Sequence, residues 1–338
     1  MIKQFSRLLF LASLAGNGLA NPADIYVSSA GSTFVYPMLG KWMREYLKIR
    51  PELKISYDPV GSGHGIARVF AGTVDFGASD TPLTDRELKV APKRVLQIPV
   101  VLGAVVPAYN LPGLPDDLRF PQQVLAGIYL GRITRWNDPA LMRANPGVHL
   151  PDRPISVLFR IDTSGTTFVW TDFLSKVSPD WKRSVGRSAA VSFPIGTGAF
   201  FNEGVVQEIK SRPYSLGYLQ STYAIENHLQ FGSVENANGR FVRTSCLTIT
   251  GAARGVLELA PDFRVSITNT KAEDAYPVSS FTWLVIPEKI EDSRKRQALA
   301  EFLTWVLTKG QYLAASKYYA PLPGEVAQRA LRTVSAIQ

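Results

Sequence analysis

A guanidinium, a carboxylate and small hydroxyl-bearing residues occur together in one short segment and could bind an anion. Arg160 can donate two parallel hydrogen bonds to an oxyanion, and Asp162 is close enough in sequence to orient it. The segment precedes a helical pattern whose apolar residues share one face: Trp170, Phe173, Leu174 and Val177. Ser164, Gly165 and Thr166 are therefore expected at a helix N-terminus, where unpaired backbone N–H groups favour a negative charge. An ordinary capped helix after a turn would give the same pattern.

The same construction of strand, small-residue loop and helix occurs twice more, which favours the anion-binding interpretation. The loop 28–34 follows a strand-like run and ends in Thr33 and Phe34. The loop 60–65 follows a second strand-like run and contains Ser62. Backbone amides and hydroxyl groups of all three loops, together with the guanidinium, could converge on one oxyanion.

Asp80 is the unusual member of this set, because a carboxylate beside a bound anion is repulsive. It follows the strand-like run 74–79, and ligands of open α/β sheets collect beyond the carboxyl ends of strands. The carboxylate is useful if the ligand donates a proton, which monohydrogen and dihydrogen phosphate can do and sulfate at neutral pH cannot. Facing sulfate, a buried Asp80 would lack a donor, at a cost of about 1–3 kcal/mol. The alternative is that Asp80 caps the turn or helix before Thr81 and Pro82.

Strands alternate with helices along the chain, which predicts an α/β fold. With 338 residues, the chain is long enough for two domains. Apolar runs on either side of Gly103 indicate that the chain crosses into a second domain there, and we expect it to return just before Pro277. We therefore expect residues 21–102 and 277–338 to form lobe 1, and residues 103–276 to form lobe 2.

Residues 1–20 have the positive, apolar and small-residue regions of a cleavable signal peptide, which predicts export without insertion into the membrane. Their apolar run is shorter than the about 20 residues that a membrane span needs. Cys246, as the single cysteine, cannot form an internal disulfide. The net charge is +9, but lysine and arginine form no long block, so nucleic-acid binding has little support.

The sequence contains no motif for nucleotide phosphate binding, no HExxH and no GxSxG. Three histidines and one cysteine without paired spacing argue against a metal site. We therefore expect no metal, no cofactor, no catalytic residue and no enzymatic activity. The enzymatic alternative is a nucleophile pair formed by His64 with Ser62 or Ser164.

Longer motifs are spread along nearly the whole mature chain and include Gly31–Phe34, Val60–Gly63, Val74–Asp80, Arg160–Thr167 and Asp274–Pro277. They resemble the motifs of the periplasmic phosphate-binding protein of the bacterial ABC phosphate importer. The resemblance implies a class II periplasmic binding protein, with two α/β lobes joined by a hinge that the chain crosses twice. Such a protein closes on phosphate in the cleft between its lobes.

The resemblance also implies roles for single residues. The implied phosphate-binding residues are Thr33, Phe34, Ser62, Asp80, Arg160, Ser164, Gly165 and Thr166. Asp80 would accept the proton of the ligand, and Asp162 would hold and partly neutralise Arg160. The implied partners are inorganic phosphate and the membrane permease of an ABC transporter. The expected location is the periplasm, and the expected state is a monomer.

Two residues depart from the family pattern. His64 stands where the family usually has a small residue, and Thr163 stands where glycine is common. His64 could add a titrating positive charge near the mouth of the cleft, whereas Thr163 could stiffen the turn. The alternatives on the same fold are a receptor for another oxyanion, a phosphate sensor without transport, a secreted phosphate-ester hydrolase and an exported adhesion protein.

Overall fold

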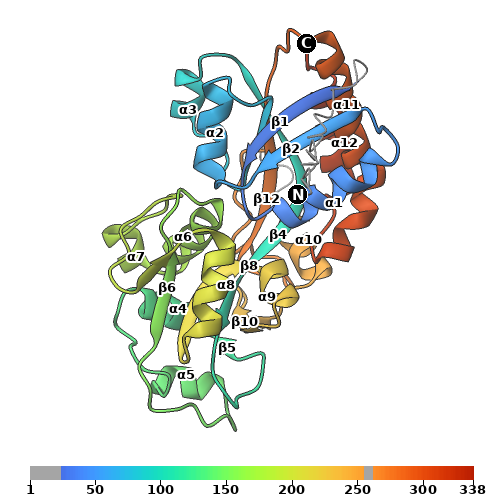
Figure 1. Cartoon of the computed structure of the whole chain (residues 1–338). Helices are drawn as coiled ribbons and strands as arrows, with labels where there is room; N and C mark the ends of the chain where they lie inside the picture. Colours follow the sequence, from blue (N-terminus) through green and yellow to red (C-terminus); the bar gives the residue numbers. More distant parts are fainter. Residues whose placement is uncertain (1–23, 255–261) are drawn as a thin grey trace, which may run out of the picture.

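Two α/β lobes share one sheet that runs through the middle of the molecule (Figure 1). The computed structural model describes residues 24–254 and 262–338, so the predicted signal peptide lies outside the described residues. Lobe 1 contains both ends of the described chain, and lobe 2 contains its middle part. Strands and helices alternate in both lobes, which confirms the predicted α/β class.

The elements follow one another along the chain in this order. The first group is β1 (Ile25–Gly31), α1 (Tyr36–Leu47), β2 (Leu53–Asp58), α2 (Ser62–Phe70), β3 (Phe76–Ser79), α3 (Asp85–Val90) and β4 (Val95–Tyr109). The second group is β5 (Arg119–Phe120), α4 (Gln122–Tyr129), α5 (Pro139–Ala144), β6 (Ser156–Arg160), α6 (Gly165–Val177), α7 (Pro179–Ser184), β7 (Thr197–Ala199), α8 (Phe201–Ser211) and β8 (Ser215–Gln220). The third group is α9 (Ser221–Glu226), β9 (Gln230–Phe231), β10 (Ser233–Glu235), β11 (Phe241–Val242), α10 (Cys246–Arg254), β12 (Ser279–Pro287), α11 (Ser293–Leu307), the 3-10 helix η1 (Lys309–Lys317) and α12 (Gly324–Val334).

The long strand β4 connects the two lobes. Its residues 95–104 pair with β12, and its residues 105–109 pair with β8. The strand therefore changes its partner between Ala104 and Val105, directly after Gly103. Most residues of β4 and β12 are buried, as expected for strands that are covered on both faces. The lobe boundaries given above stay predictions.

The sheet brings the carboxyl ends of several strands together. Among the described residues, the strand order is β2-β1-β3-β12-β4-β8-β6-β7, with β9 beside β4. Strand β1 is parallel to β2 and β3, and strand β6 is parallel to β7 and β8. The antiparallel strands β12 and β4 lie between these two parallel groups. The loops after β1, β2, β3 and β6 carry the residues singled out from the sequence, so each of those residues lies at the carboxyl end of a strand.

Helix α6 confirms the helix predicted after the anion-binding segment. The apolar residues predicted to share one face of this helix are all buried: Trp170, Phe173, Leu174 and Val177. The Trp170 ring stacks on Tyr218 of β8 with ring centroids 5.3 Å apart, and it meets Tyr129 of α4 edge-on at 5.4 Å. Aromatic pairs of this kind contribute about 0.5–1.5 kcal/mol each beyond their area burial. The packing fixes the direction of α6 and therefore the position of its N-terminus.

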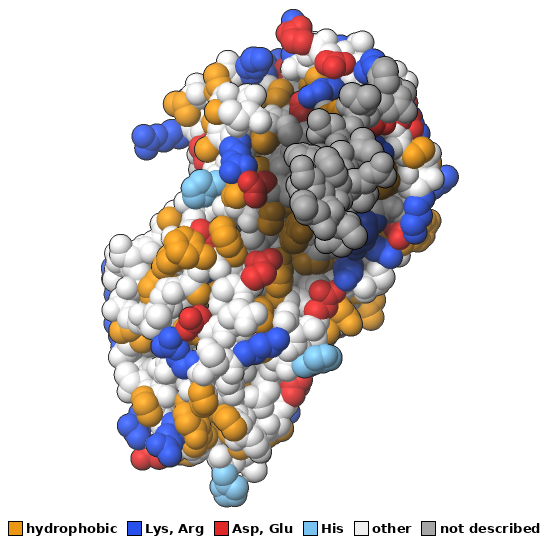
Figure 2. All heavy atoms as spheres, in the orientation of Figure 1, with side chains coloured by type: hydrophobic (Ala, Val, Ile, Leu, Met, Phe, Trp, Pro, Cys, Tyr) orange, Lys and Arg blue, Asp and Glu red, His pale blue; other side chains and the backbone are white. Residues whose placement is uncertain are grey.

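Charged side chains of both signs are interspersed over both lobes on the face shown in Figure 2. The charges that matter for the candidate site are inside, because Asp80 is 1% exposed and Arg160 is 3% exposed. None of the helices in the described part of the chain is both long enough and apolar enough to cross a membrane.

Candidate functional site

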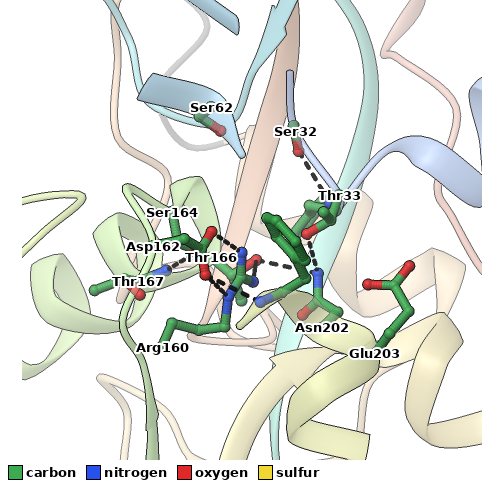
Figure 3. Close-up of polar contacts among 12 residues, drawn as sticks. Ser32, Thr33, Ser62, Arg160, Asp162, Ser164, Thr166, Thr167, Asn202 and Glu203 are labelled. Atoms are coloured by element: carbon green, nitrogen blue, oxygen red, sulfur yellow. Dashed lines mark hydrogen bonds and ion pairs between the residues drawn. The ribbon is translucent and has the colours of Figure 1, made fainter. Parts of the chain in front are cut away.

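The N-terminus of α6 forms one side of the candidate site (Figure 3). Ser164 is the N-cap residue of this helix, and its Oγ accepts a hydrogen bond from the Thr167 N–H at 3.2 Å. The ordinary capping role is therefore present. The amides of Gly165 and Thr166 come before Thr167 and have no intrahelical acceptor. Because these residues are buried, the positive ends of two amide dipoles lie inside the protein and can meet an anion there.

Arg160, the last residue of β6, lies beside this helix end and forms a buried ion pair with Asp162. Its Nε donates to Asp162 Oδ1 at 2.7 Å, and its Nη2 donates to Asp162 Oδ2. Asp162 Oδ1 also accepts from the Phe201 N–H at 3.0 Å. The remaining guanidinium nitrogen, Nη1, lies 3.4 Å from Thr166 Oγ1. The pair therefore fixes the guanidinium so that Nη1 points toward the start of α6.

Asp80 directly follows β3 in lobe 1 and is buried. Its Oδ2 accepts from the hydroxyl groups of Ser32 and Ser62, the latter at 3.3 Å, and its Oδ1 accepts from Thr282 at 2.5 Å. Burial raises the pKa of Asp80 to about 6, although these hydroxyl groups and the charge of Arg160 act to lower it. The expectation that Asp80 lacks a donor unless the ligand supplies one is wrong, because three hydroxyl groups donate to it.

This arrangement changes the physical reason for discrimination between anions. The penalty for an unsatisfied acceptor does not apply, because Asp80 already has donors. The binding of an unprotonated dianion next to an ionised Asp80 is opposed by like-charge repulsion. The capping alternative for Asp80 is also wrong. Thr84 is the N-cap of α3, where its side chain and that of Glu87 form a capping box.

The loop of Thr33 and Phe34 forms a third part of the site. Thr33 Oγ1 accepts from Asn202 Nδ2 at 2.9 Å, and the Thr33 carbonyl accepts from the Tyr223 hydroxyl at 2.8 Å. The Phe34 N–H donates to Ser32 Oγ at 3.0 Å, so Ser32 links this amide to Asp80. The Phe34 ring is fully buried. The loop is therefore held from lobe 1 by its own serine and from lobe 2 by two side chains.

Glycines allow the two lobes to approach each other closely at the site. A Cβ atom on Gly165 would lie 2.4 Å from Ser62 Oγ and 2.5 Å from Asp80 Oδ2, closer than real Cβ atoms come. The Gly63 N–H donates to the Thr163 carbonyl at 3.1 Å, and a Cβ atom on Gly63 would lie 2.2 Å from Thr163 Cγ2. The loop that begins α2 therefore packs directly on the loop that begins α6.

The structure brings all of the sequence-predicted residues to one place, with four on lobe 1 and the others on lobe 2: Thr33, Phe34, Ser62, Asp80, Asp162, Arg160, Ser164, Gly165 and Thr166. Sequence reasoning missed Ser32, Asn202 and Thr282. Ser32 lies inside a loop that was already singled out, so a hydroxyl count of that loop could have found it. Thr282 lies where the register between β12 and β4 shifts, and no local signal marks it.

The proposed serine–histidine pairs are not formed. His64 is exposed, as the third residue of α2. Ser62 Oγ is instead bonded to Asp80, and Ser164 Oγ accepts from Thr167. Within residues 24–254 and 262–338, histidine, cysteine, aspartate and glutamate side chains form no group of three or more that could hold a metal ion.

Comparison with known proteins gives relatives over nearly the whole chain. Residues 19–309 match the family described as PBP superfamily domain. The chain is 39% identical to the phosphate-binding protein PstS of Xylella fastidiosa, over 89% of this chain and 82% of that protein. It is 38% identical to the PstS of Pasteurella multocida, over 96% of this chain and 94% of that protein.

Solved structures share the fold at lower identity. The ancestral soluble variant of the human phosphate-binding protein superposes with a TM-score of 0.72 at 19% identity, over 90% of this chain and 92% of that chain. A high-affinity periplasmic phosphate-binding protein bound with phosphate, PfluDING, superposes with a TM-score of 0.69 at 19% identity, over the same shares. The resemblance and the fold class predicted from the sequence are confirmed. The chain belongs to the PBP superfamily and, within it, to the family of the phosphate-binding proteins PstS.

Proposed function

We propose that this protein is the substrate-binding component of an ABC phosphate importer. It binds inorganic phosphate, as HPO4 or H2PO4 ions, between its two lobes and delivers it to the membrane permease. The names of its relatives support this proposal, since PstS proteins of 38–39% identity are phosphate-binding proteins. The site supports it independently, because its donors and its one proton acceptor suit a tetrahedral anion that carries a proton.

The observation that carries the proposal is the opposition of charges across the site. Lobe 2 contributes the Arg160 guanidinium and the N-terminus of α6, both of which attract an anion. Lobe 1 contributes the Asp80 carboxylate, whose pKa burial raises to about 6. The ligand that suits both sides is an anion toward lobe 2 and carries a proton on the oxygen that faces Asp80, which replaces like-charge repulsion there by a hydrogen bond. Hydrogen phosphate meets both requirements, and sulfate meets only the first.

The roles of the donors follow from their positions. The amides of Gly165 and Thr166 and the Arg160 guanidinium bind the oxygens that carry charge. The hydroxyl groups of Thr166, Ser164 and Thr33 donate to the remaining oxygens. The Ser62 hydroxyl and the Phe34 amide, which donate to Asp80 and to Ser32 Oγ in this structure, bind the ligand by exchanging those partners for it. Asp162 does not touch the ligand, because both of its oxygens are bonded to Arg160 and the Phe201 amide. Its role is to hold the guanidinium in place and to offset part of its charge.

Titration calorimetry with phosphate and with sulfate tests the proposal. We expect tight phosphate binding and sulfate binding that is weaker by about a factor of ten or more, which corresponds to about 1.4 kcal/mol. Asp80→Asn should narrow this difference, because it removes the charge that repels sulfate. Similar affinities of the unaltered protein for both anions, or no phosphate binding, would refute the proposal.

Transport is a separate part of the proposal. Deleting the gene should slow phosphate uptake by the cells, and the Arg160→Ala variant should not restore it. We also propose that residues 1–20 are removed during export, that the mature protein is a periplasmic monomer, and that the lobes divide at residues 102 and 277. N-terminal sequencing and the molar mass of the purified mature protein test the first two statements.

A further inference from the structure

A fully buried asparagine lies between the two halves of the site. Asn202, the second residue of α8, has no exposed surface, and its side chain points at Thr33 and Thr166 (Figure 3). Its Nδ2 donates to Thr33 Oγ1 at 2.9 Å and lies 3.5 Å from Thr166 Oγ1. One amide group from lobe 2 therefore contacts a hydroxyl group of lobe 1 and a hydroxyl group at the N-terminus of α6.

The orientation of this amide is fixed by the backbone. The Gln220 N–H, at the end of β8, donates to Asn202 Oδ1 at 3.1 Å. A backbone N–H can only donate, so the atom that faces it must be the amide oxygen. The opposite atom is then the NH2 group, which has two hydrogens and no lone pair to offer. Asn202 can therefore only donate to the hydroxyl groups of Thr33 and Thr166.

This one-way donation keeps the protons of the two hydroxyl groups away from Asn202. A hydroxyl group has one proton and two lone pairs. The lone pairs of Thr166 Oγ1 face two donors, Asn202 Nδ2 at 3.5 Å and Arg160 Nη1 at 3.4 Å. One lone pair of Thr33 Oγ1 is likewise taken by Asn202. Both hydroxyl groups therefore keep their protons for a third partner, since donors and not acceptors face them from the side of Asn202.

We propose that Asn202 is a positioning residue that makes the hydroxyl groups of Thr33 and Thr166 donors toward the bound anion. This inference rests on the proposed phosphate-binding function. It explains why the hydroxyl groups of Thr33 and Thr166 face the ligand as donors, whereas Asp80 faces it as an acceptor. A hydroxyl group that could turn around would offer a second acceptor, and the ligand could then place its proton elsewhere. Asn202 disfavours that orientation, because a proton of Thr33 or Thr166 cannot point at its NH2 group, and it thereby favours Asp80 as the acceptor of the ligand's proton.

The backbone conformation of the residue before Asn202 also supports the proposed role of Asn202. Phe201 has a φ of 61°, in the left-handed region that non-glycine residues rarely adopt. In that conformation its N–H donates to Asp162 Oδ1, while the next side chain reaches Thr33. Such backbone conformations are costly and persist where the surrounding contacts require them. The turn therefore links Asp162, the partner of Arg160, to Asn202, which contacts Thr33.

The decisive variant is Asn202→Asp, which keeps the size and the acceptor for Gln220 but turns the donating group into an acceptor. The hydroxyl groups would then donate to the new carboxylate and no longer to the ligand. We expect phosphate affinity, measured by calorimetry, to fall by about a hundredfold or more, and by about tenfold in Asn202→Ala. The matched control is Asn145→Ala, which removes a buried asparagine bonded to Arg119 and Leu141 outside the site and should leave the affinity unchanged.

A double-mutant cycle separates orientation from mere structural support. In a Thr33→Val, Thr166→Val background there is no hydroxyl group to orient, so Asn202→Ala should change phosphate affinity by less than about twofold. A loss as large as in the unaltered background would overturn the inference, and so would an Asn202→Asp variant that binds phosphate normally. If the unaltered protein binds no phosphate, the proposed function fails. If it binds phosphate and the cycle shows no coupling, only this inference fails.

Discussion

Replacing Asp80 by asparagine should make the phosphate-free protein more stable at neutral pH, although the residue belongs to the proposed site. The carboxylate is 1% exposed, and burial raises its pKa from 3.8 to about 6. Asparagine has nearly the same shape and carries no charge. Its amide oxygen can still accept a hydrogen bond from Thr282, and its NH2 group can donate to Ser32 and Ser62. The substitution therefore removes the cost of burying a charge and keeps the packing.

The size and sign of the effect follow from the pKa. At about 1.36 kcal/mol per pKa unit, a rise from 3.8 to about 6 corresponds to about 3 kcal/mol. Because the pKa is higher in the folded state, the carboxyl group costs no stability below the unfolded value. The destabilisation builds up as the pH rises from the pKa of the unfolded chain to the pKa of the folded protein, and it is complete above the folded pKa. Weaker hydrogen bonds to the neutral amide reduce the gain, so we expect Asp80→Asn to stabilise by about 1–3 kcal/mol at about pH 8.

Calorimetric unfolding in phosphate-free buffer at about pH 4 and about pH 8 measures this difference. The stabilisation should be present at the higher pH and nearly absent at the lower one. Asp162→Asn is the matched control, since Asp162 is also a buried carboxylate but is paired with Arg160. Removing one partner of a buried ion pair should destabilise by about 3–5 kcal/mol. The reasoning is refuted if Asp80→Asn is less stable than the unaltered protein at the higher pH, or if its effect does not depend on pH.

Three further substitutions test other parts of the structure. Arg160→Gln should weaken phosphate binding by about 2 kcal/mol or more, since a charge-assisted contact is lost, and unchanged calorimetric affinity would contradict its role. Gly165→Ala adds a Cβ atom that would collide with Asp80, so small-angle scattering at saturating phosphate should show a more open molecule than the unaltered protein. Gly103→Ala places a Cβ atom 2.4 Å from the Phe34 ring, and overpacking of this kind should lower the free energy of unfolding in urea by about 1–3 kcal/mol, whereas equal stability would show that the ring can move aside.

The site residues could be predicted from the sequence because each is part of a local pattern. Asp80 follows a short strand, and Ser164 precedes the apolar face of a helix, so their places at strand ends could be inferred without knowing the neighbours of each strand. The α/β class follows from the same alternation. These features depend on residues that are close in sequence, where spacing carries the information.

The residues that sequence reasoning missed are those whose role depends on distant pairing. Thr282 reaches Asp80 because β12, from the end of the chain, lies between β3 and β4. Asn202 reaches Thr33 because the lobes are closed on each other, and the two residues are far apart in the sequence. The hydrogen bonds that Asp80 accepts within the protein could not be predicted for the same reason. Its donors Ser32, Ser62 and Thr282 come from three separate elements, and no local pattern relates them.

The distribution of charge between the lobes has a kinetic consequence. The attractive groups, Arg160 and the start of α6, lie on one lobe, and the repelling carboxylate of Asp80 lies on the other. Any tetrahedral anion should therefore land on the first lobe at a similar rate. The protein discriminates between competing anions only when lobe 1 closes on lobe 2 and brings Asp80 into contact with the bound anion. Phosphate and sulfate should then differ in how long they remain bound, and hardly at all in how fast they are captured.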